Sequence, residues 1–324
     1  MTKILINCAK LSKTNSIYSV NLMQTQERSF SIKKIKFAFK NYLEISKPRS
    51  VILLYFTSIT AMLIASSTYG FDVKKIILLS VAVILGVMGT NATTNYIDRK
   101  IDAIMERTKK RAIASGKINP AKKGLIFAII LIVSGIAIAA CVNWLASVFL
   151  FLGFFDSAII YNGLTKRKSK FNILYGSFAG GFPVLVGWAG ISSGRVDLLA
   201  VIMFIFVIIW TPAHIWSLAY FYKEDYRKAN IPMLPVFLSE RQNHFLLASL
   251  NVLMIISSVI LWYVYSLSFI YLGVVLAFSL ALIIVSVIMI ARSGKKYAWI
   301  LFKLSSPYLG LVFLLLLIEF LVIK

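Results

Sequence analysis

The sequence predicts an all-α, polytopic membrane protein: a bundle of about nine transmembrane helices with its N-terminus in the cytoplasm. Three observations support this fold class. Of 324 residues, 59% are hydrophobic and only 12 are acidic, which excludes an ordinary water-soluble domain. Apolar stretches of about 20 residues, the length that a helix needs to cross a bilayer, occur repeatedly. The 35 lysines and arginines lie mainly in the short segments between these stretches.

Nine candidate spans can be placed along the chain, each close to the length of a membrane-crossing helix. Their approximate ranges are 50–68, 75–95, 124–142, 144–163, 173–193, 198–220, 244–265, 267–291 and 297–323. The third and fourth spans are the hardest to separate, because only the segment NWLA, from Asn143 to Ala146, divides them.

The basic residues set the expected orientation. The segment before the first span has 10 lysines and arginines, and alternate loops after it have 9, 4, 4 and 3. The opposite side has Lys74, Lys75, Arg195 and Lys324, while Lys303 falls within the last span. Because basic residues favour the inner side of a membrane, the N-terminus and the loops after even-numbered spans are expected in the cytoplasm, or in an organelle's matrix. The charge therefore needs no nucleic acid partner to explain it.

Residues 1–45 are expected to form a polar, basic N-terminal arm, followed by a transmembrane domain at residues 46–324. The arm has no apolar core with a small-residue cleavage site, so it does not match a secretory signal, and it has too little arginine for a transit peptide. We interpret it as disordered or lying on the membrane surface. Apolar residues at helical spacing between the lysines of residues 31–49 favour an interfacial helix there.

The segment after the second span concentrates charge in an otherwise apolar sequence. From Asn91 to Arg111 it reads NATTNYIDRKIDAIMERTKKR. If the helix continues past Gly89, side chains with oxygen atoms recur at steps of four, three, four and four and lie along one face. These residues are Asn91, Asn95, Asp98, Asp102 and Glu106.

Two carboxylates a turn apart suit a hard cation such as Mg²⁺, which prefers oxygen ligands and completes its coordination with water and substrate phosphates. The cations that follow directly, suited to phosphate oxygens, are Arg107, Lys109, Lys110 and Arg111. A solvated loop with salt bridges would explain the charge alone. Asn91 and Asn95, however, lie inside the apolar run, and polar side chains at membrane depth usually mark function. The segment therefore predicts a metal-held diphosphate site.

The same segment, NYIDRKIDAIMERTKKR, resembles the first aspartate-rich motif of the UbiA-type intramembrane prenyltransferases, specifically their protohaem IX farnesyltransferase (haem O synthase) branch. Three further segments are similar to that branch: YLEISKPRS (Tyr42–Ser50), YNGLTKRKSKFNILYGSFAGGFPVLVGW (Tyr161–Trp188) and WTPAHIWSLAYFYKEDYRKANIPMLPV (Trp210–Val236). The resemblance covers roughly residues 42–236. It implies Mg²⁺ as cofactor and transfer of a farnesyl group from farnesyl diphosphate to haem b, a substrate rather than a permanent cofactor, for terminal oxidase cofactor synthesis.

The resemblance also implies roles for individual residues. The catalytic residues, which would also hold the metal, are Asn95, Asp98, Asp102 and Asp225. The substrate-binding residues would be Asn91, Arg107, Arg111, Lys166, Arg167, Lys223, His214, Trp216, Lys47 and Arg49. The family's first motif usually continues with a proline where this chain has Ala112, a change expected to affect the loop rather than the chemistry.

The second motif, FYKEDYRKANIPMLP, lies at the inner end of the sixth span, on the same side as Asp98 and Asp102. Asp225 of this motif is therefore expected to face the first motif across a pocket. Pro232 and Pro235 end the helix and suit a structured cap over that pocket.

Other polar residues within or beside the spans have simpler interpretations. His214 allows two, a contact with haem and an interhelical hydrogen bond. Asp156 is not part of the family pattern; it could be a hydrogen-bonded structural group or a local pocket residue, and we favour the structural interpretation. Gly176 and Gly180 have the small-xxx-small spacing of closely packed helices. His244, at the start of the seventh span, is expected at the surface.

Three alternatives remain open. Another prenyltransferase of the superfamily, acting on a quinone precursor or a lipid glycerol, would be favoured by a second motif richer in acids. A transporter would also place Asn, Asp and His in the membrane, although the charges here cluster at one face and no inverted pair of broken helices is evident. A structural assembly factor that merely binds haem would not need Asp98 and Asp102.

The expected location is the plasma membrane of a prokaryote, crossed several times, with the active-site loops in the cytoplasm. The expected partners are farnesyl diphosphate, haem b, the lipid bilayer and a haem A synthase or oxidase assembly factor, with no nucleic acid.

Overall fold

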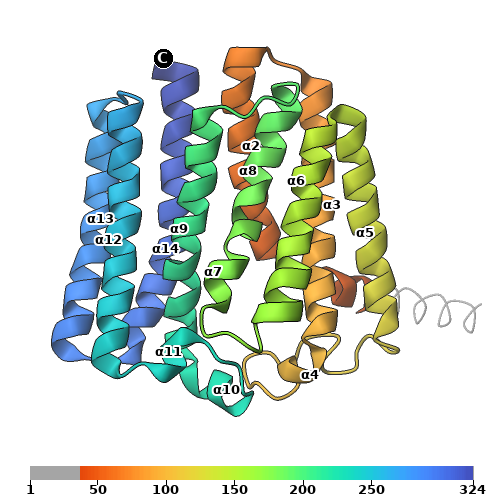
Figure 1. Ribbon diagram of the computed structural model, residues 1–324, viewed down its shortest axis with the longest axis vertical. Coiled ribbons are helices and arrows are strands. Elements are labelled where there is room, and N and C mark those ends of the chain that lie inside the picture. The colour runs from red at the N-terminus through yellow and green to blue at the C-terminus, as the bar shows by residue number, and fades with distance from the viewer. Residues whose placement is uncertain (1–36, 324) are drawn as a thin grey trace, which may run out of the picture. The chain divides into compact units, whose positions relative to one another are not determined.

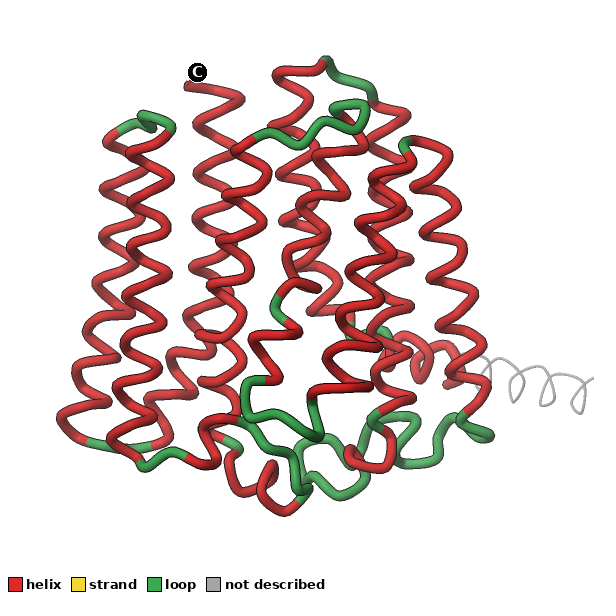
Figure 2. Tube along the Cα trace, viewed as in Figure 1, coloured by secondary structure: helices red, strands yellow, loops and turns green. Residues whose placement is uncertain are grey.

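The computed structural model describes residues 37–323, and from Ile45 onward the chain forms one compact unit. The described residues contain helices and turns but no strand, and nine of their helical segments are long and apolar enough to cross a membrane. Figures 1 and 2 show these helices side by side in a bundle. The predicted all-α fold, a bundle of membrane-crossing helices, is therefore confirmed. The predicted N-terminal arm falls mostly outside the described residues, and residues 37–45 are helical.

Each span begins within a few residues of its predicted start. The spans are α2 (Pro48–Tyr69), α3 (Val73–Ile97), α5 (Lys122–Val142), α6 with the π-helix η1 (Trp144–Phe155, Asp156–Thr165), α7 with α8 (Asn172–Gly176, Phe178–Ile191), α9 (Leu198–Phe221), α12 (Glu240–Val264), α13 (Phe269–Arg292) and α14 with the π-helix η2 (Lys295–Ile318, Glu319–Ile323). Three short helices lie in loops: α4 (Arg99–Asp102), α10 (Lys223–Lys228) and α11 (Leu234–Phe237). All three gather at one end of the bundle, at the bottom of Figure 1.

Local capping explains where several helices begin. Asn143 is extended, and its side-chain oxygen accepts the backbone N–H groups of Leu145 and Ala146 at 2.9 and 3.3 Å. This cap separates α5 from α6, the two spans that hydropathy barely divides. Ser239 forms a capping box with Gln242 at the start of α12. Each cap satisfies backbone donors that the first helical turn leaves unpaired.

Small residues let the central helices approach closely. A Cβ atom on Gly187 of α8 would lie 2.5 Å from the backbone oxygen of Ser58 on α2, and one on Gly135 of α5 would lie 2.8 Å from that of Ala82 on α3. Such contacts are typical of helices packed in membranes. Together with buried side chains such as Phe206, they form a core among α2, α8, α9 and α14.

The fourth and fifth spans depart from regular α-helix at positions that the sequence pattern does not predict. The helix α6 changes to a π-helix at Asp156, and the fifth span breaks at Ser177, between α7 and α8. The buried Asp156 carboxylate accepts the backbone N–H of Ala179, in the first turn of α8, at 2.8 Å. This contact supports the structural interpretation of Asp156. By contrast, α9 runs through Pro212 without a break.

The prediction of a surface position for His244 is wrong. His244 is only 2% exposed, and its Nε2 lies 3.2 Å from the Tyr220 hydroxyl. Because α12 begins at Glu240, before the predicted start, His244 lies a full turn inside the helix and faces α9.

Candidate active site

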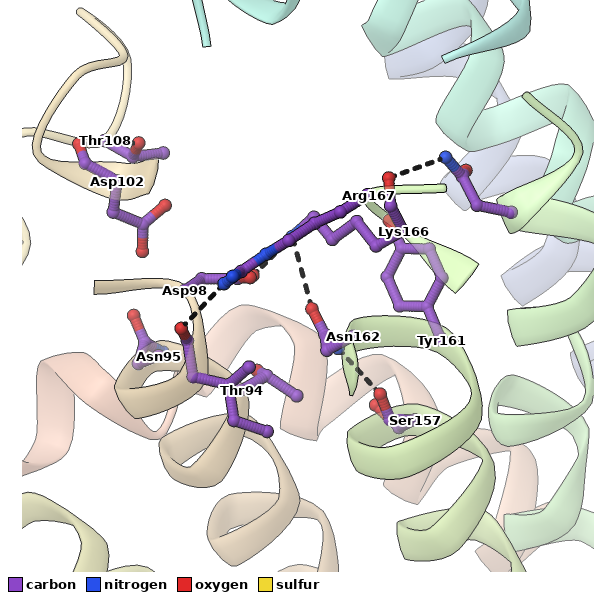
Figure 3. Close-up of polar contacts among 12 residues, drawn as sticks. Thr94, Asn95, Asp98, Asp102, Thr108, Ser157, Tyr161, Asn162, Lys166 and Arg167 are labelled. Atoms are coloured by element: carbon purple, nitrogen blue, oxygen red, sulfur yellow. Dashed lines mark hydrogen bonds and ion pairs between the residues drawn. The ribbon is translucent and has the colours of Figure 1, made fainter. Parts of the chain in front are cut away.

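The two aspartates of the first motif lie where α3 ends and α4 follows. Asp98 separates the two helices and Asp102 ends α4, one turn later. Each is 4% exposed. Lys166 forms an ion pair with Asp98, and Arg111 contacts both carboxylate oxygens of Asp102 at 2.9 and 2.8 Å. Figure 3 shows Lys166 reaching across from the loop after η1 toward the end of α3.

One carboxylate oxygen of Asp98 has no hydrogen-bonding partner among the described residues. Asp98 uses Oδ2 for Lys166, whereas its Oδ1 is buried and makes no hydrogen bond with any described residue. Buried carboxylate oxygens are normally paired with a donor or a metal. Among the described residues, no three His, Cys, Asp or Glu side chains gather into a metal site. The residues therefore fit a Mg²⁺ ion held by two carboxylates, with water and phosphate oxygens as its other ligands.

The two asparagines hold the start of α2 against α3. Asn91 donates its side-chain N–H to the backbone oxygen of Ser46 at 3.1 Å, and Asn95 donates to that of Ile45 at 2.8 Å. Both amide nitrogens thus have structural partners. A contact between Asn95 and the metal would have to use its amide oxygen.

This connection places Lys47 beside the aspartates. Lys47 has a left-handed backbone conformation, with φ 51° and ψ 68°, that is uncommon for residues with a Cβ atom. Its ammonium donates to the Thr94 hydroxyl at 3.2 Å. Burial, together with the nearby charges of Arg111 and Lys166, lowers the pKa of Lys47 to about 7, although the two aspartates oppose this shift. Three cations thus surround two carboxylates.

The π-helix η1 positions the next cationic loop. Asn162 accepts from the Lys166 ammonium at 3.2 Å and donates to the backbone oxygen of Ser157 at 2.7 Å (Figure 3). Arg167 donates to the backbone oxygen of Ile97, at the end of α3, at 3.2 Å. Both predicted cations of this loop therefore contact the segment that contains Asp98.

The second motif contacts the first through the loop after α4. The Asp225 carboxylate accepts the backbone N–H of Arg107 at 3.1 Å, and the Arg107 side chain donates to the Tyr226 hydroxyl at 3.4 Å. Asp225 thus joins α10 to this loop and does not form a three-carboxylate cluster with Asp98 and Asp102 among the described residues. Lys223, also of α10, lies 5.5 Å from the Tyr220 ring.

The predicted row of oxygen atoms ends at Asp102. The Glu106 side chain is 66% exposed and pairs with Lys109 at 2.6 Å. The expectation that Glu106 shares the helix face is therefore wrong. Because α4 ends at Asp102, the chain turns and no longer follows the helical spacing.

A cavity of about 880 Å³ lies between the helices, and its lining residues come from α2, α3, α6, η1, α7, α8, α9 and α14. Asn91 is among its lining residues, two helical turns along α3 from Asp98. Most of the other lining residues are apolar. Its size lies within the range of about 300–1,000 Å³ typical of small-molecule sites.

His214 lines this cavity and also joins two helices. Its Nδ1 lies 2.8 Å from the Ser305 hydroxyl of α14, and its ring stacks between those of Trp210 and Phe302, with centroids 4.6 and 4.3 Å away. The interhelical hydrogen bond is thus present, and a contact with an occupant of the cavity remains compatible with it. Trp216 is buried and is not among the described lining residues, so the structure gives its predicted substrate contact no support.

A model of the UbiA prenyltransferase family matches residues 54–307. The chain belongs to this family. A protoheme IX farnesyltransferase of Thermoplasma volcanium is 38% identical over 279 residues, which cover 86% of this chain and 96% of that protein. A protein of the same name from Desulforudis audaxviator is 37% identical over 86% of this chain and 88% of its own length. The family that the motifs predict is therefore confirmed.

Solved structures of UbiA proteins have the same fold. A digeranylgeranylglyceryl phosphate synthase has a TM-score of 0.70 at 20% identity, covering 87% of this chain and 98% of that one. A UbiA homologue from Archaeoglobus fulgidus, bound to GPP and Mg²⁺, has a TM-score of 0.57 at 14% identity, covering 85% and 99%.

The cavity lining of this UbiA protein includes residues that were not predicted as site residues, among them Tyr161 and Lys303. Tyr161 lies in η1, near the C-terminal end of the fourth span, with the Lys166 ammonium 5.5 Å from its ring centroid. Lys303 lies within α14. Each had a sequence signal: Tyr161 begins a segment that resembles the family, and Lys303 is a charge inside a span.

Proposed function

We propose that this UbiA prenyltransferase transfers the farnesyl group of farnesyl diphosphate to a vinyl group of haem b and so forms haem O, in a Mg²⁺-dependent reaction. The observation that carries the chemistry is the buried, unpaired Asp98 oxygen beside Asp102, near a largely apolar cavity. The acceptor is inferred from relatives named protoheme IX farnesyltransferase, which match 86% of the chain.

In this proposal the protein binds the diphosphate with cations that already surround the aspartates. Arg111 uses NH1 for Asp102 and has further N–H donors for phosphate oxygens. Lys166 and Lys47 add two positive charges. Asp98 and Asp102, with the Asn95 oxygen, would hold Mg²⁺, and Asp225 would keep the Arg107 loop over the site. When bound, Mg²⁺ supplies stabilisation of the charge that develops on the leaving diphosphate.

The reaction does not require a nucleophile activated by the protein. Cleavage of the allylic carbon–oxygen bond leaves a delocalised farnesyl cation, which the π electrons of a haem vinyl group can attack. Water then adds to the resulting cation and loses a proton, giving the hydroxyethylfarnesyl group. The cavity's apolar walls would hold the farnesyl chain and keep water from reaching the first cation too early.

A membrane assay with haem b, farnesyl diphosphate and Mg²⁺ tests this proposal. We expect a haem product whose mass has increased by the hydroxyethylfarnesyl addition. The product should disappear in Asp98→Asn and Asp102→Asn and after metal removal, but remain in Glu106→Gln, which alters an exposed carboxylate nearby. Unchanged haem together with prenylation of a quinone precursor or a lipid glycerol would reject the acceptor and keep the reaction class.

A further inference from the structure

The described lining of the cavity includes positively charged side chains but no carboxylate. Among its described lining residues, the side chains with a full charge are Arg49 and Lys303, and none is a carboxylate. Sites for small molecules are mostly apolar, and the few polar groups in them fix the ligand's orientation. A largely apolar cavity with two cations and no carboxylate in its described lining favours an anionic, largely apolar ligand.

The two cations come from neighbouring helices at opposite ends of the sequence. Arg49 lies in the first turn of α2, and Lys303 lies two turns into α14, a rise of about 12 Å from the start of that helix at 1.5 Å per residue. Both helices contribute further lining residues, among them Leu53 and Ser306. The cations therefore belong to two different walls of one cavity.

Neither cation has a carboxylate partner within the described part of the chain, where no ion pair includes Arg49 or Lys303. By contrast, Lys166 and Arg111 each hold an aspartate. Lys303 contacts the Trp299 ring at 5.2 Å. A lysine within a membrane helix costs about 2.5–3.5 kcal/mol on insertion scales, and such residues are usually retained for function.

The proposed acceptor has the matching chemistry, since haem b carries two propionate carboxylates on an otherwise apolar ring. We propose that Arg49 and Lys303 bind these two carboxylates and thereby orient the acceptor in the cavity. Arginine can hold a carboxylate with two parallel hydrogen bonds, whereas lysine acts as a point charge. This inference rests on the proposed function and adds two residues that select the acceptor, apart from the cations around Asp98 and Asp102 that bind the donor's diphosphate.

Comparing haem b with its dimethyl ester tests the inference, because the ester retains the ring and the vinyl groups but lacks both negative charges. The purified full chain, in lipid nanodiscs, is titrated with each compound and binding is followed by absorbance. We expect the wild type to bind haem b at least tenfold more tightly than the ester. The double variant Arg49→Gln/Lys303→Met should bind the two compounds with nearly equal affinity.

Matched variants separate charge from packing. Lys303→Arg keeps the charge and should keep the preference for haem b, and Lys296→Met, which removes an exposed lysine of the same helix outside the cavity lining, should leave the preference unchanged. The double variant should still bind farnesyl thiodiphosphate, an unreactive donor analogue, with Mg²⁺. These results would show that the two cations act on the acceptor's carboxylates.

Other results would overturn the inference. A wild type that farnesylates haem b but binds the ester equally well would refute the carboxylate contacts and leave the proposed function standing. A double variant that keeps the preference for haem b but loses the donor analogue would assign both cations to the diphosphate. A wild type that neither binds nor farnesylates haem b would reject the proposed function, and the inference with it.

Discussion

Arg111 differs from the other basic residues of its loop because it alone contacts both oxygens of a buried carboxylate. We expect Arg111→Lys to lower kcat/KM by about 10- to 100-fold, since lysine keeps the charge but lacks the further N–H donors that the guanidinium has besides the one nitrogen held by Asp102, and one hydrogen bond to a charged group contributes about 1.5–3 kcal/mol. Lys110→Met, at an exposed position in the same loop, should stay close to wild type. Equal losses in both variants would indicate that only the net charge of the loop matters.

Lys47 should make donor binding depend on pH. Its pKa of about 7 in the free protein means that it loses its proton as the pH rises through neutrality. Because a diphosphate favours the charged form, binding above pH 7 includes proton uptake, and the Kd should rise by up to about tenfold per pH unit. The Kd of farnesyl thiodiphosphate measured at pH 6.5, 7.5 and 8.5 checks this. Lys47→Arg, which stays charged, should show a flatter profile, and identical slopes would contradict the assignment.

The carboxylates could be identified from sequence because Asp98 and Asp102 fall at helical spacing next to an apolar run. Their partners could not. The pairing of Lys166 with Asp98 depends on η1 and on the bend of its loop, and the turn after Asp102 removes Glu106 from the face that the spacing predicts. Periodicity assumes a continuous helix, so it fails at the helix end where the site lies.

At the scale of elements, the contact between Asp156 and Ala179 joins two irregularities: the π-helix η1 begins at Asp156, and α8 restarts beside Ala179. Asp156→Leu leaves that backbone N–H without its acceptor in the membrane, which should cost about 1–3 kcal/mol and lower the unfolding temperature. Asp156→Asn keeps an acceptor oxygen and should retain most of the stability. Thermal unfolding of the purified variants measures both.

A catalytic role for Asp156 would produce a different pattern. Asp156→Asn would then lose farnesyl transfer while unfolding at the wild-type temperature. The structural role predicts that activity and stability change together across the two variants, with leucine the more damaging.

Hydropathy was enough to place the spans, since about 20 apolar residues match the thickness of the bilayer core, and a helix satisfies their backbone groups there without water. It could not reveal the break at Ser177 or the change to a π-helix, because both lie at a contact between two spans, in which the Asp156 carboxylate accepts the backbone N–H of Ala179. The division at Asn143 is hard to predict for a local reason. A single capping residue separates α5 from α6, so no polar loop marks the boundary in the sequence.

On the scale of the whole molecule, the site gathers segments that are distant in sequence: the turn before α2, the end of α3, the loop after η1 and α10. Figure 1 shows α4 and α10 at the same end of the bundle. The distribution of basic residues predicted this grouping, because loops after even-numbered spans must share one side of the membrane. It did not predict the cavity, whose charged lining combines the first span with the ninth.

The remaining question at this scale is which side of the membrane holds the site. With 30 basic residues assigned to one side and four to the other, we expect the loop after α4 in the cytoplasm and the loop between α8 and α9 outside. Single cysteines test this in a chain with Cys8 and Cys141 replaced by serine: Lys110→Cys marks the first loop and Val196→Cys the second. In intact cells, a membrane-impermeant maleimide should label only the Val196→Cys chain.

After permeabilisation the same reagent should label both chains, which controls for the reactivity of each cysteine. Labelling of Lys110→Cys alone in intact cells would reverse the orientation and place the aspartates on the outer face. The fold would survive that result, but the donor would then have to reach the site from outside the cell. An inward-facing site instead receives a water-soluble diphosphate directly from the cytoplasm, while the apolar cavity accepts its hydrocarbon chain from the membrane side.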